Sequence, residues 1–144
     1  MKVVAPQTPG DFVRYYALRF DVLRKPWNQP PGSEKDELEP TAIHAMIVSD
    51  EGEVVGVCRM QYNSSEEAQL RYMGIRDDCQ GKGIGNLLIA HFETMARAAG
   101  KKRMVLEARE KAVTFYERNG YSVLAKSYLM WGIIQHYRME KRLC

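Results

Sequence analysis

Apolar side chains recur along the chain with two different periods, and each change of period marks the boundary of a predicted helix or strand. The segment after Thr8 has the period of a helix, because four large apolar residues are spaced four, four and three positions apart. Thr8 suits the N-cap and Pro9 the first helical position, while Pro26 ends the pattern. The residues of this predicted buried face are Phe12, Tyr16, Phe20 and Leu23.

The segment Lys25–Thr41 breaks this pattern with four prolines, a glycine and several charges. It predicts a long loop with room for one helical turn, and loops of this length in compact domains often carry function. Strand-like runs at 42–49 and 54–62 follow, and they flank a turn signal at Asp50-Glu51-Gly52-Glu53. This arrangement predicts a β-hairpin.

A third strand, at 69–75, leads into the glycine-rich segment Gln80–Gly85, and an amphipathic helix that ends near Gly100 follows directly. The predicted inner face of that helix consists of Ile84, Leu88, His91 and Met95, flanked by Leu87 and Phe92. The remaining predicted elements are strands at 3–4, 103–108, 121–126 and 134–142, a short helix at 112–119 and a loop at 127–132.

The order of these elements predicts an α/β (α+β) fold, since hairpins occur at both ends and crossover helices in the middle. Such an order gives a mixed sheet with helices on both faces. The length of 144 residues is typical of one domain, so we expect residues 1–144 to form a single domain.

Composition and charge exclude several other classes of protein. No apolar run approaches the ~20 residues that cross a bilayer, and the first residues lack a signal-peptide core, so we expect a cytoplasmic protein without a membrane partner. The three cysteines are widely spaced, which predicts free thiols and no metal site. A net charge of +3 and the short basic run Lys101–Arg103 are too weak to predict a nucleic-acid partner.

The glycine-rich segment predicts an anion site, because the unpaired N–H groups and the dipole of the following helix point at one spot. A dinucleotide fingerprint needs a third glycine where Asn86 or Leu88 stands, depending on the frame. A P-loop needs a hydroxyl residue where Gly83 stands. A different phosphate-bearing ligand is therefore expected.

The segment Gln80–Gly85 does match the pattern Q/R-x-x-G-x-G, and here the sequence resembles the GNAT superfamily of N-acetyltransferases. A second segment, Ala112–Tyr121, is similar to that family's A-x-x-F-Y-E-x-x-G-F/Y block. Weaker similarity to small bacterial members lies in Leu18–Val22, in His44 and in His136–Met139. Gln135 departs from the proline that this subgroup often carries.

The resemblance implies a mostly antiparallel sheet of six to seven strands that is splayed between its central strands. It also implies that the pantetheine arm of acetyl-CoA lies in that gap and that the pyrophosphate binds backbone amides of the glycine-rich segment. Lys82 would add a positive charge there or would be an ordinary solvated lysine. The implied cofactor residues are Met73, Gly74, Ile75, Gln80, Gly81, Lys82, Gly83, Gly85, Asn86 and Tyr116.

By the same resemblance, the reaction transfers an acetyl group from acetyl-CoA to a primary amine, and Tyr116 is the general acid. A tyrosine, with a pKa near ~10, can protonate a departing thiolate with a pKa near ~8.5. Plain core packing is the alternative role for Tyr116. A non-catalytic acyl-CoA-binding module of the same fold is the alternative function, and it would need no acid or base.

An acceptor ammonium must lose a proton before it attacks, and residues 70–75 offer no acidic side chain. Glu107 and His136 are the two candidate bases, with His44 as a more distant third. Glu107 could instead be an ordinary strand residue, and His136 a capping histidine. The resemblance implies that Lys25–Thr41, with Trp27, and Tyr128–Trp131 wall the acceptor site. The acceptor is a small-molecule or peptide amine, and a homodimer is left open.

Overall fold

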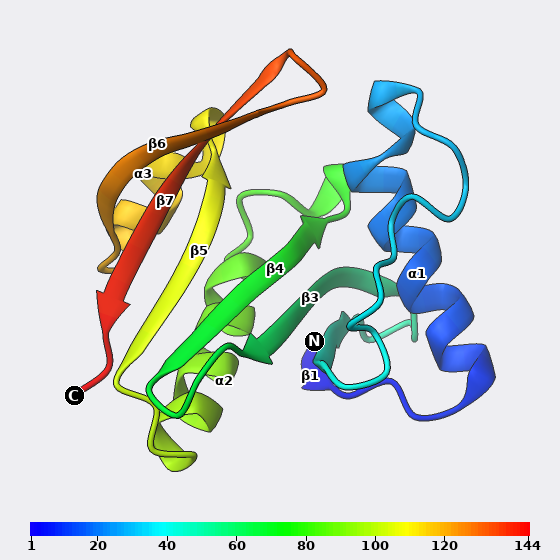
Figure 1. The fold of residues 1–144 in the computed structure, drawn as a ribbon. Coiled ribbons are helices and arrows are strands. Elements are labelled where there is room, and N and C mark those ends of the chain that lie inside the picture. Colours follow the sequence, from blue (N-terminus) through cyan, green and yellow to red (C-terminus); the bar gives the residue numbers. More distant parts are fainter. The chain divides into compact units, whose positions relative to one another are not determined.

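The computed structural model describes residues 1–144, and its seven strands form one sheet in the order β1-β2-β3-β4-β5-β7-β6 (Figure 1). The pairs β1–β2, β2–β3, β5–β7 and β6–β7 are antiparallel, while β4 and β5 are parallel. The predicted α/β fold with a mostly antiparallel mixed sheet is thus confirmed. The strands are β1 (Lys2–Val4), β2 (Ile43–Val48), β3 (Val54–Tyr62), β4 (Glu67–Ile75), β5 (Arg103–Arg109), β6 (Ser122–Met130) and β7 (Ile134–Arg142), and the α-helices are α1 (Pro9–Leu23), α2 (Ile84–Ala98) and α3 (Val113–Arg118).

The chain divides into two compact units. Unit 1 comprises residues 1–61 and 72–92, and unit 2 comprises residues 62–71 and 93–144. Each unit therefore holds a part of β4 and a part of α2. That residues 1–144 act as a single domain stays a prediction. None of the helices is both long and apolar enough to cross a bilayer, and the cytoplasmic location likewise stays a prediction.

Helix α1 begins where the sequence predicts, because Thr8 and Asp11 form a capping box. The Thr8 hydroxyl accepts a hydrogen bond of 3.0 Å from the Asp11 N–H, and the Asp11 carboxylate accepts one of 3.2 Å from the Thr8 N–H. The predicted buried face, however, is wrong. Its members are only partly buried, whereas the fully buried residues of α1 are Tyr15, Leu18 and Arg19.

The predicted face differs from the buried one because a search for apolar residues at helical spacing does not include an arginine, even where that arginine is buried. Tyr15 and Leu18 pack against Met46 of β2 and Val57 of β3, and they form the core of unit 1 together with these residues. Arg19 can be buried beside them because its guanidinium forms an ion pair with Glu39 at 2.9 Å. Of the predicted face, Phe12 and Tyr16 instead pack against this core as partly buried residues.

The hairpin β2–β3 is confirmed, with Ala45 opposite Cys58 and Ile43 opposite Met60. Gly52 closes its turn at a φ of +82°. On β3, a Cβ at Gly56 would come within 2.7 Å of the Ile84 side chain, so the strand needs a glycine there to let α2 approach. In Figure 1, α1 and the first half of α2 cover opposite faces of these strands.

The inner face of α2 is predicted only in part. Ile84, Leu88 and Phe92 are buried as expected, but His91 and Met95 are half-buried and Leu87 is 45% exposed. Buried positions that the pattern missed are Ile89, Glu93 and Ala96. Glu93 is buried because it accepts hydrogen bonds of 2.9 Å from Tyr121 and from Lys141.

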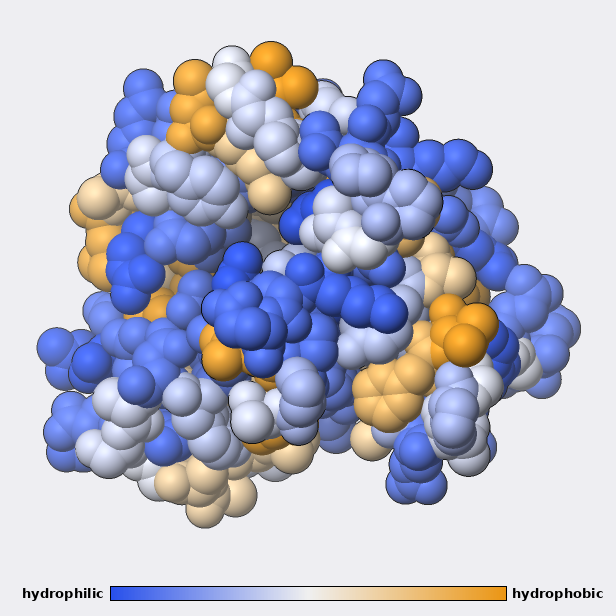
Figure 2. All heavy atoms as spheres, turned by 45° about the vertical axis from the view of Figure 1, so that its right-hand side comes forward, coloured by the Kyte–Doolittle hydropathy of each residue, from blue (hydrophilic) through white to orange (hydrophobic).

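In unit 2, β6 is longer than predicted. The expected loop at 127–132 is instead mostly strand, since β6 continues to Met130 and pairs with β7 through Leu129–Gln135 and Met130–Ile134. Backbone pairing with β7 supplies the hydrogen bonds that hold this segment extended, and local sequence cannot reveal such a partner. The turn is confined to residues 131–133. The face drawn in Figure 2 is largely hydrophilic, with exposed apolar side chains in small separate patches.

Candidate active site

The glycine-rich segment lies between the end of β4 and the start of α2 in unit 1. A short 3-10 helix, Asp77–Cys79, precedes it, and the buried Cys79 side chain anchors this turn. Arg76 fixes the turn from outside, since its guanidinium binds Asp78 and Glu53 at 2.6 Å each. The segment from Gln80 to Gly83 is exposed, and α2 begins at the next residue.

This segment fits a pyrophosphate group. Gly81 and Gly83 have φ values of +78° and +79°, which favour glycine, and a Cβ at either position would meet no atom within 4 Å. A phosphate can therefore approach the backbone closely at both glycines. The first N–H groups of a helix have no partner within the helix, and its dipole attracts an anion to this end. Lys82 is exposed beside these glycines, which is compatible with either of its two predicted roles.

The predicted pantetheine residues form the last part of β4, also in unit 1. Met73 and Ile75 are half-buried, and Gly74 is buried. Tyr72, directly before them, has a φ of +56°, which is unusual for an aromatic residue within a strand. The parallel pairing of β4 with β5 covers Glu67–Leu70 and Arg103–Leu106, close to the N-terminal ends of both strands.

Tyr116 lies on the short helix α3 of unit 2 and is only 9% exposed. Its ring forms edge contacts with Phe115 at 5.1 Å and with Tyr121 at 6.0 Å between centroids. The Tyr116 carbonyl accepts hydrogen bonds from the N–H groups of Asn119 and Tyr121, at 3.0 and 3.1 Å. The helix end and the following strand therefore fix the backbone that carries this phenol.

Glu107 lies on β5 of unit 2 directly opposite Arg138 of β7. Its Oε1 accepts a hydrogen bond of 2.9 Å from Arg138, while its Oε2 is buried and has no hydrogen-bond donor. A buried carboxylate oxygen without a donor is uncommon, because desolvation is then uncompensated. Glu107 is thus half of an ion pair with one proton-accepting oxygen left unsatisfied, and not the ordinary exposed strand residue of the alternative interpretation.

His136 is the first residue of β7 that pairs with β5, and it is only 5% exposed. Its Nδ1 lies 3.0 Å from the Ile134 carbonyl, which can only accept, so Nδ1 carries the proton and the lone pair of the neutral ring is on Nε2. The ring stacks on Tyr128 at 4.4 Å between centroids, with an interplanar angle of 11°. The capping interpretation is therefore correct for Nδ1.

The strand register brings the two candidate bases together. Glu107 pairs with Arg138 and Arg109 pairs with His136, so all four side chains belong to one face of the β5–β7 pair. Diagonal neighbours of this kind have Cβ atoms roughly 7–8 Å apart. Glu107 and His136 thus share one surface, which the sequence could not indicate because they lie on different strands with α3 and β6 between them in the chain.

The chain matches the family model described as "Acetyltransferase (GNAT) family" over residues 12–121. The chain belongs to the GNAT family of acetyltransferases. An uncharacterized N-acetyltransferase of Bacillus subtilis, YjcF, is 28% identical to it over 141 residues, which cover 98% of this chain and 99% of YjcF. The family predicted from the two motifs is thereby confirmed.

Solved structures agree with this GNAT assignment at the level of the fold. An acyl-CoA N-acyltransferase from Pseudomonas aeruginosa has a TM-score of 0.82 at 20% identity and covers 97% of each chain. An aminoglycoside 6'-N-acetyltransferase complexed with coenzyme A also has a TM-score of 0.82, at 17% identity, over 100% of this chain and 98% of its own. These structures show that the protein has the GNAT fold, and its match to the family model shows that it is an acyltransferase.

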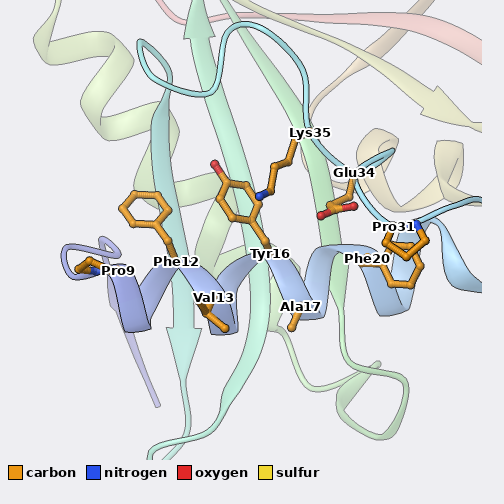
Figure 3. Close-up of a pocket in the computed structure, with 9 residues that line it drawn as sticks. All are labelled: Pro9, Phe12, Val13, Tyr16, Ala17, Phe20, Pro31, Glu34 and Lys35. Carbon is orange, nitrogen blue, oxygen red and sulfur yellow. The ribbon is translucent and has the colours of Figure 1, made fainter.

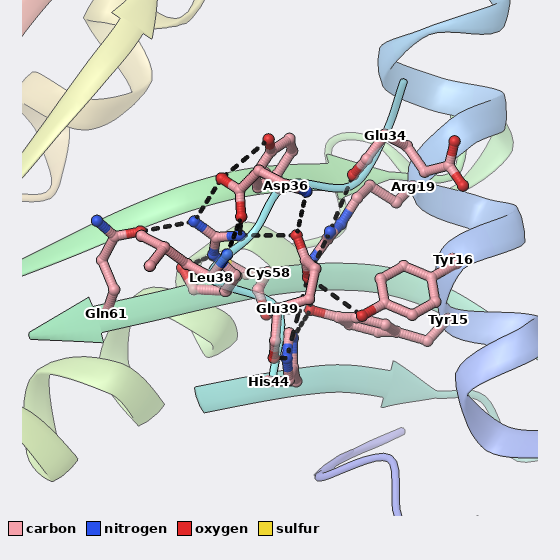
Figure 4. A network of polar contacts seen from close by, with 12 residues as sticks. Tyr15, Tyr16, Arg19, Glu34, Asp36, Leu38, Glu39, His44, Cys58 and Gln61 are labelled. Carbon is pink, nitrogen blue, oxygen red and sulfur yellow. Dashed lines mark hydrogen bonds and ion pairs between the residues drawn. The ribbon is translucent and has the colours of Figure 1, made fainter. Parts of the chain in front are cut away.

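Sequence reasoning missed a buried network of charges in unit 1 of this GNAT protein (Figure 4). Arg19 of α1 and Arg59 of β3 are both 0% exposed. Glu39, from the long loop, joins them by accepting hydrogen bonds of 2.9 Å from Arg19 and 2.7 Å from Arg59. Asp36 adds a two-pronged pair with Arg59 at 2.6 and 3.0 Å. The signal that could have found it is an arginine inside an apolar helix, followed by acidic residues in the loop.

The third candidate base, His44, belongs to this network and is not available to a substrate. Its Nε2 donates to the Glu39 carbonyl at 2.9 Å, and its Nδ1 lies 2.8 Å from the Tyr15 hydroxyl. Burial lowers the pKa of His44 below its ordinary value of 6.5, so the ring is neutral at physiological pH. Both nitrogens are therefore occupied by the fold itself, and His44 has a structural role.

An open pocket of about 610 Å³ lies along the outer side of α1 (Figure 3). Three members of the predicted buried face, Phe12, Tyr16 and Phe20, line it together with Glu34 and Lys35 of the long loop. None of the predicted site residues lines this pocket. Trp27, expected at the acceptor site, is half-buried on the single 3-10 turn Lys25–Trp27 that begins the loop.

Proposed function

We propose that this protein transfers the acetyl group of acetyl-CoA directly to a primary amine of a small molecule or peptide, and that residues 1–144 act as one catalytic domain. The observation that carries the proposal is the glycine-rich segment between β4 and α2. Its two open glycines at positive φ suit a pyrophosphate, and it occurs in a member of a family of acetyltransferases.

The binding residues have distinct proposed tasks. Backbone amides of Gln80 to Gly85 bind the pyrophosphate, with Asn86 in the first turn of α2. Backbone groups of Met73, Gly74 and Ile75 bind the pantetheine arm as an added strand would. A backbone amide of this strand stabilises the developing oxyanion, since fixed donors act strongly where water is excluded.

Two proton transfers complete the proposed reaction. The Tyr116 hydroxyl protonates the sulfur as the thiolate departs, because its ordinary pKa of ~10 lies above that of the thiol at ~8.5. Glu107 or His136 accepts the proton that the acceptor ammonium loses. The unsatisfied Oε2 of Glu107 and the place of His136 on the same strand face support these two groups over His44, whose two nitrogens are both hydrogen-bonded within the fold.

The direct test is a panel of amine acceptors with acetyl-CoA, in which the release of free thiol is followed. We expect release that depends on one class of amine and that is saturable in both substrates. The panel includes diamines, amino sugars and peptides with free N-termini, so a positive response also narrows the acceptor class. Tight coenzyme A binding without amine-dependent thiol release would favour the non-catalytic acyl-CoA-binding module.

A further inference from the structure

Tyr72 occupies a strained position at the point where β4 enters the proposed pantetheine site. Its φ of +56° lies in the left-handed region, although it is a bulky residue within a strand and is followed directly by Met73. A conformation of this kind persists only where the surrounding structure holds it. The contacts of the Tyr72 ring are therefore informative about what fixes this part of β4.

Three guanidinium groups surround the Tyr72 ring. Their Cζ atoms lie 4.4 Å from the ring centroid for Arg19, 4.9 Å for Arg59 and 5.5 Å for Arg24. Arg19 and Arg59 are both 0% exposed, and a cation interacts more strongly with an aromatic face when water is excluded. The ring thus lies among cations that favour its present orientation.

The cations themselves are held in fixed orientations. The two-pronged pair with Asp36 and the bond to Glu39 define the plane of the Arg59 guanidinium. Glu39, the Glu34 carbonyl and the Tyr15 hydroxyl do the same for Arg19, at 2.9, 3.0 and 2.9 Å. Figure 4 shows these partners reaching the two arginines from α1 and the long loop.

The strand beyond Tyr72 packs against the helix that carries Arg19. A Cβ at Gly74 would lie 3.4 Å from Val22 and 3.6 Å from Leu23 of α1, which is van der Waals contact. The direction of the chain at Tyr72 therefore decides whether Gly74 meets α1 at this distance. It also sets the orientation of the backbone groups of Met73–Ile75.

We propose that Arg19, Arg59 and Tyr72 form a clamp that holds the change of direction in β4 and so orients Met73–Ile75 for the pantetheine arm. This inference rests on the proposed function. Asp36 and Glu39 orient the two arginines, so the long loop is linked through these ion pairs to the strand that we assign to the cofactor. All five are positioning residues, since none of them is assigned to the reacting atoms.

The test compares two ligands by calorimetry. Coenzyme A carries the pantetheine arm, whereas 3′-phosphoadenosine 5′-diphosphate carries the same pyrophosphate without it. For Tyr72→Leu we expect the Kd of coenzyme A to rise about ten-fold, equivalent to about 1.4 kcal/mol, and the Kd of the fragment to change less than about two-fold. Tyr72→Phe keeps the aromatic ring, and we expect this variant to bind coenzyme A with the affinity of the unaltered protein.

Tyr62→Leu is the matched control, because Tyr62 is a 41% exposed tyrosine at the end of β3 that also has a cation, Lys101, over its ring at 4.4 Å. It should bind both ligands as the unaltered protein does. Should Tyr72→Leu fail to fold, Asp36→Asn provides the second variant, and it should also weaken coenzyme A more than the fragment.

Three results would overturn the clamp. The first is unchanged coenzyme A affinity in a folded Tyr72→Leu variant, or in Asp36→Asn when that variant is the one tested. The second is an equal loss of affinity for both ligands, which would indicate a general disturbance of unit 1. The third is an unaltered protein that binds neither ligand, which would refute the proposed function itself and with it this inference.

Discussion

At the scale of single residues, Gly83 decides how closely a phosphate can approach the start of α2. Its φ of +79° strains any residue with a side chain, while the space around a Cβ there is empty of protein atoms. A side chain at this position would therefore project into the volume that we assign to the pyrophosphate.

We expect Gly83→Val to abolish detectable acetyl-CoA binding in calorimetry while the protein stays folded. Gly52→Val is the matched control, because Gly52 has a φ of +82° and equally empty surroundings but lies in the β2–β3 turn. It introduces the same kind of backbone strain and should leave binding intact. Undiminished affinity in a folded Gly83→Val variant would refute the phosphate-site assignment.

Tyr116 is the second residue whose side chain can be tested in isolation. We expect Tyr116→Phe to lower kcat by roughly the ~10²-fold that the loss of a general acid causes, with little change in cofactor affinity. The ring contacts with Phe115 and Tyr121 would be retained, so the fold should not suffer. Steady-state kinetics and calorimetry measure the two effects separately, and an unchanged kcat would make Tyr116 a packing residue only.

The free-energy cost of the left-handed φ at Tyr72 can be compared with the stabilisation from the cations that contact its ring. A non-glycine residue in the left-handed region costs about 1–3 kcal/mol. A desolvated cation over an aromatic face contributes about 2 kcal/mol, and Tyr72 has two fully buried arginines beside it. The two contacts are thus large enough to offset the strain, whereas a single exposed cation at ~0.5–1 kcal/mol would fall short of most of that range.

At the scale of secondary-structure elements, the pairing of β5 with β7 makes a prediction about pH. Glu107 and His136 share one face of this strand pair, and they are the two groups that we propose as bases for the acceptor's proton. We expect kcat/KM to rise with pH through an apparent pKa between about 6 and 8, since the base must be deprotonated before it can act.

Two variants assign this pH dependence. His136→Ala or Glu107→Gln should remove the rising limb, depending on which group is the base, and the other variant should retain it. His44→Gln is the control, because both nitrogens of His44 are already hydrogen-bonded within the fold. If both variants kept the original profile, the proton would instead leave through water to bulk solvent.

At the scale of the whole molecule, the buried network should make the stability of the protein depend on pH in two steps. Burial lowers the pKa of His44 below 6.5, so the unfolded chain binds its proton more readily than the folded one. The free energy of unfolding therefore has its full value with respect to His44 above pH 6.5. It decreases as the pH falls, by up to about 1.4 kcal/mol per pH unit.

The second step involves Glu39, and it occurs at lower pH. Burial opposes the charge of Glu39, but the Arg19 guanidinium, the Asp36 N–H group and Arg59 together outweigh this effect and hold the pKa of the carboxyl below 4.5. Its contribution is therefore present above pH 4.5 and is lost as the pH falls further. Protonation of Glu39 would leave two buried arginines with one carboxylate between them, which is costly.

Urea denaturation at a series of pH values measures both steps. We expect the free energy of unfolding to decline from pH 6.5 downwards and to fall again below pH 4.5. His44→Gln should remove the first decline and keep the second. A free energy of unfolding that stayed constant between pH 7 and 5 would contradict the neutral, buried state of His44.

The sequence by itself determined the family, the strand–glycine–helix unit at Gln80–Gly85 and most element boundaries, because these depend on local patterns. Thr8 and Asp11 form a capping box over four residues, and Gly52 closes a turn over four as well, so neighbouring residues suffice to specify them. The motif around Tyr116 is likewise contiguous in sequence.

Only the tertiary structure decided which residues are buried and which side chains meet. Arg19 is buried because Glu39 lies 20 positions away in the chain and next to it in space. Glu107 and His136 share a face through the register of two strands, and β6 extends to Met130 because β7 pairs with it. Pairing between distant residues supplies the hydrogen bonds and opposite charges that make these arrangements stable. The spacing of apolar residues along the chain does not indicate which distant residues pair.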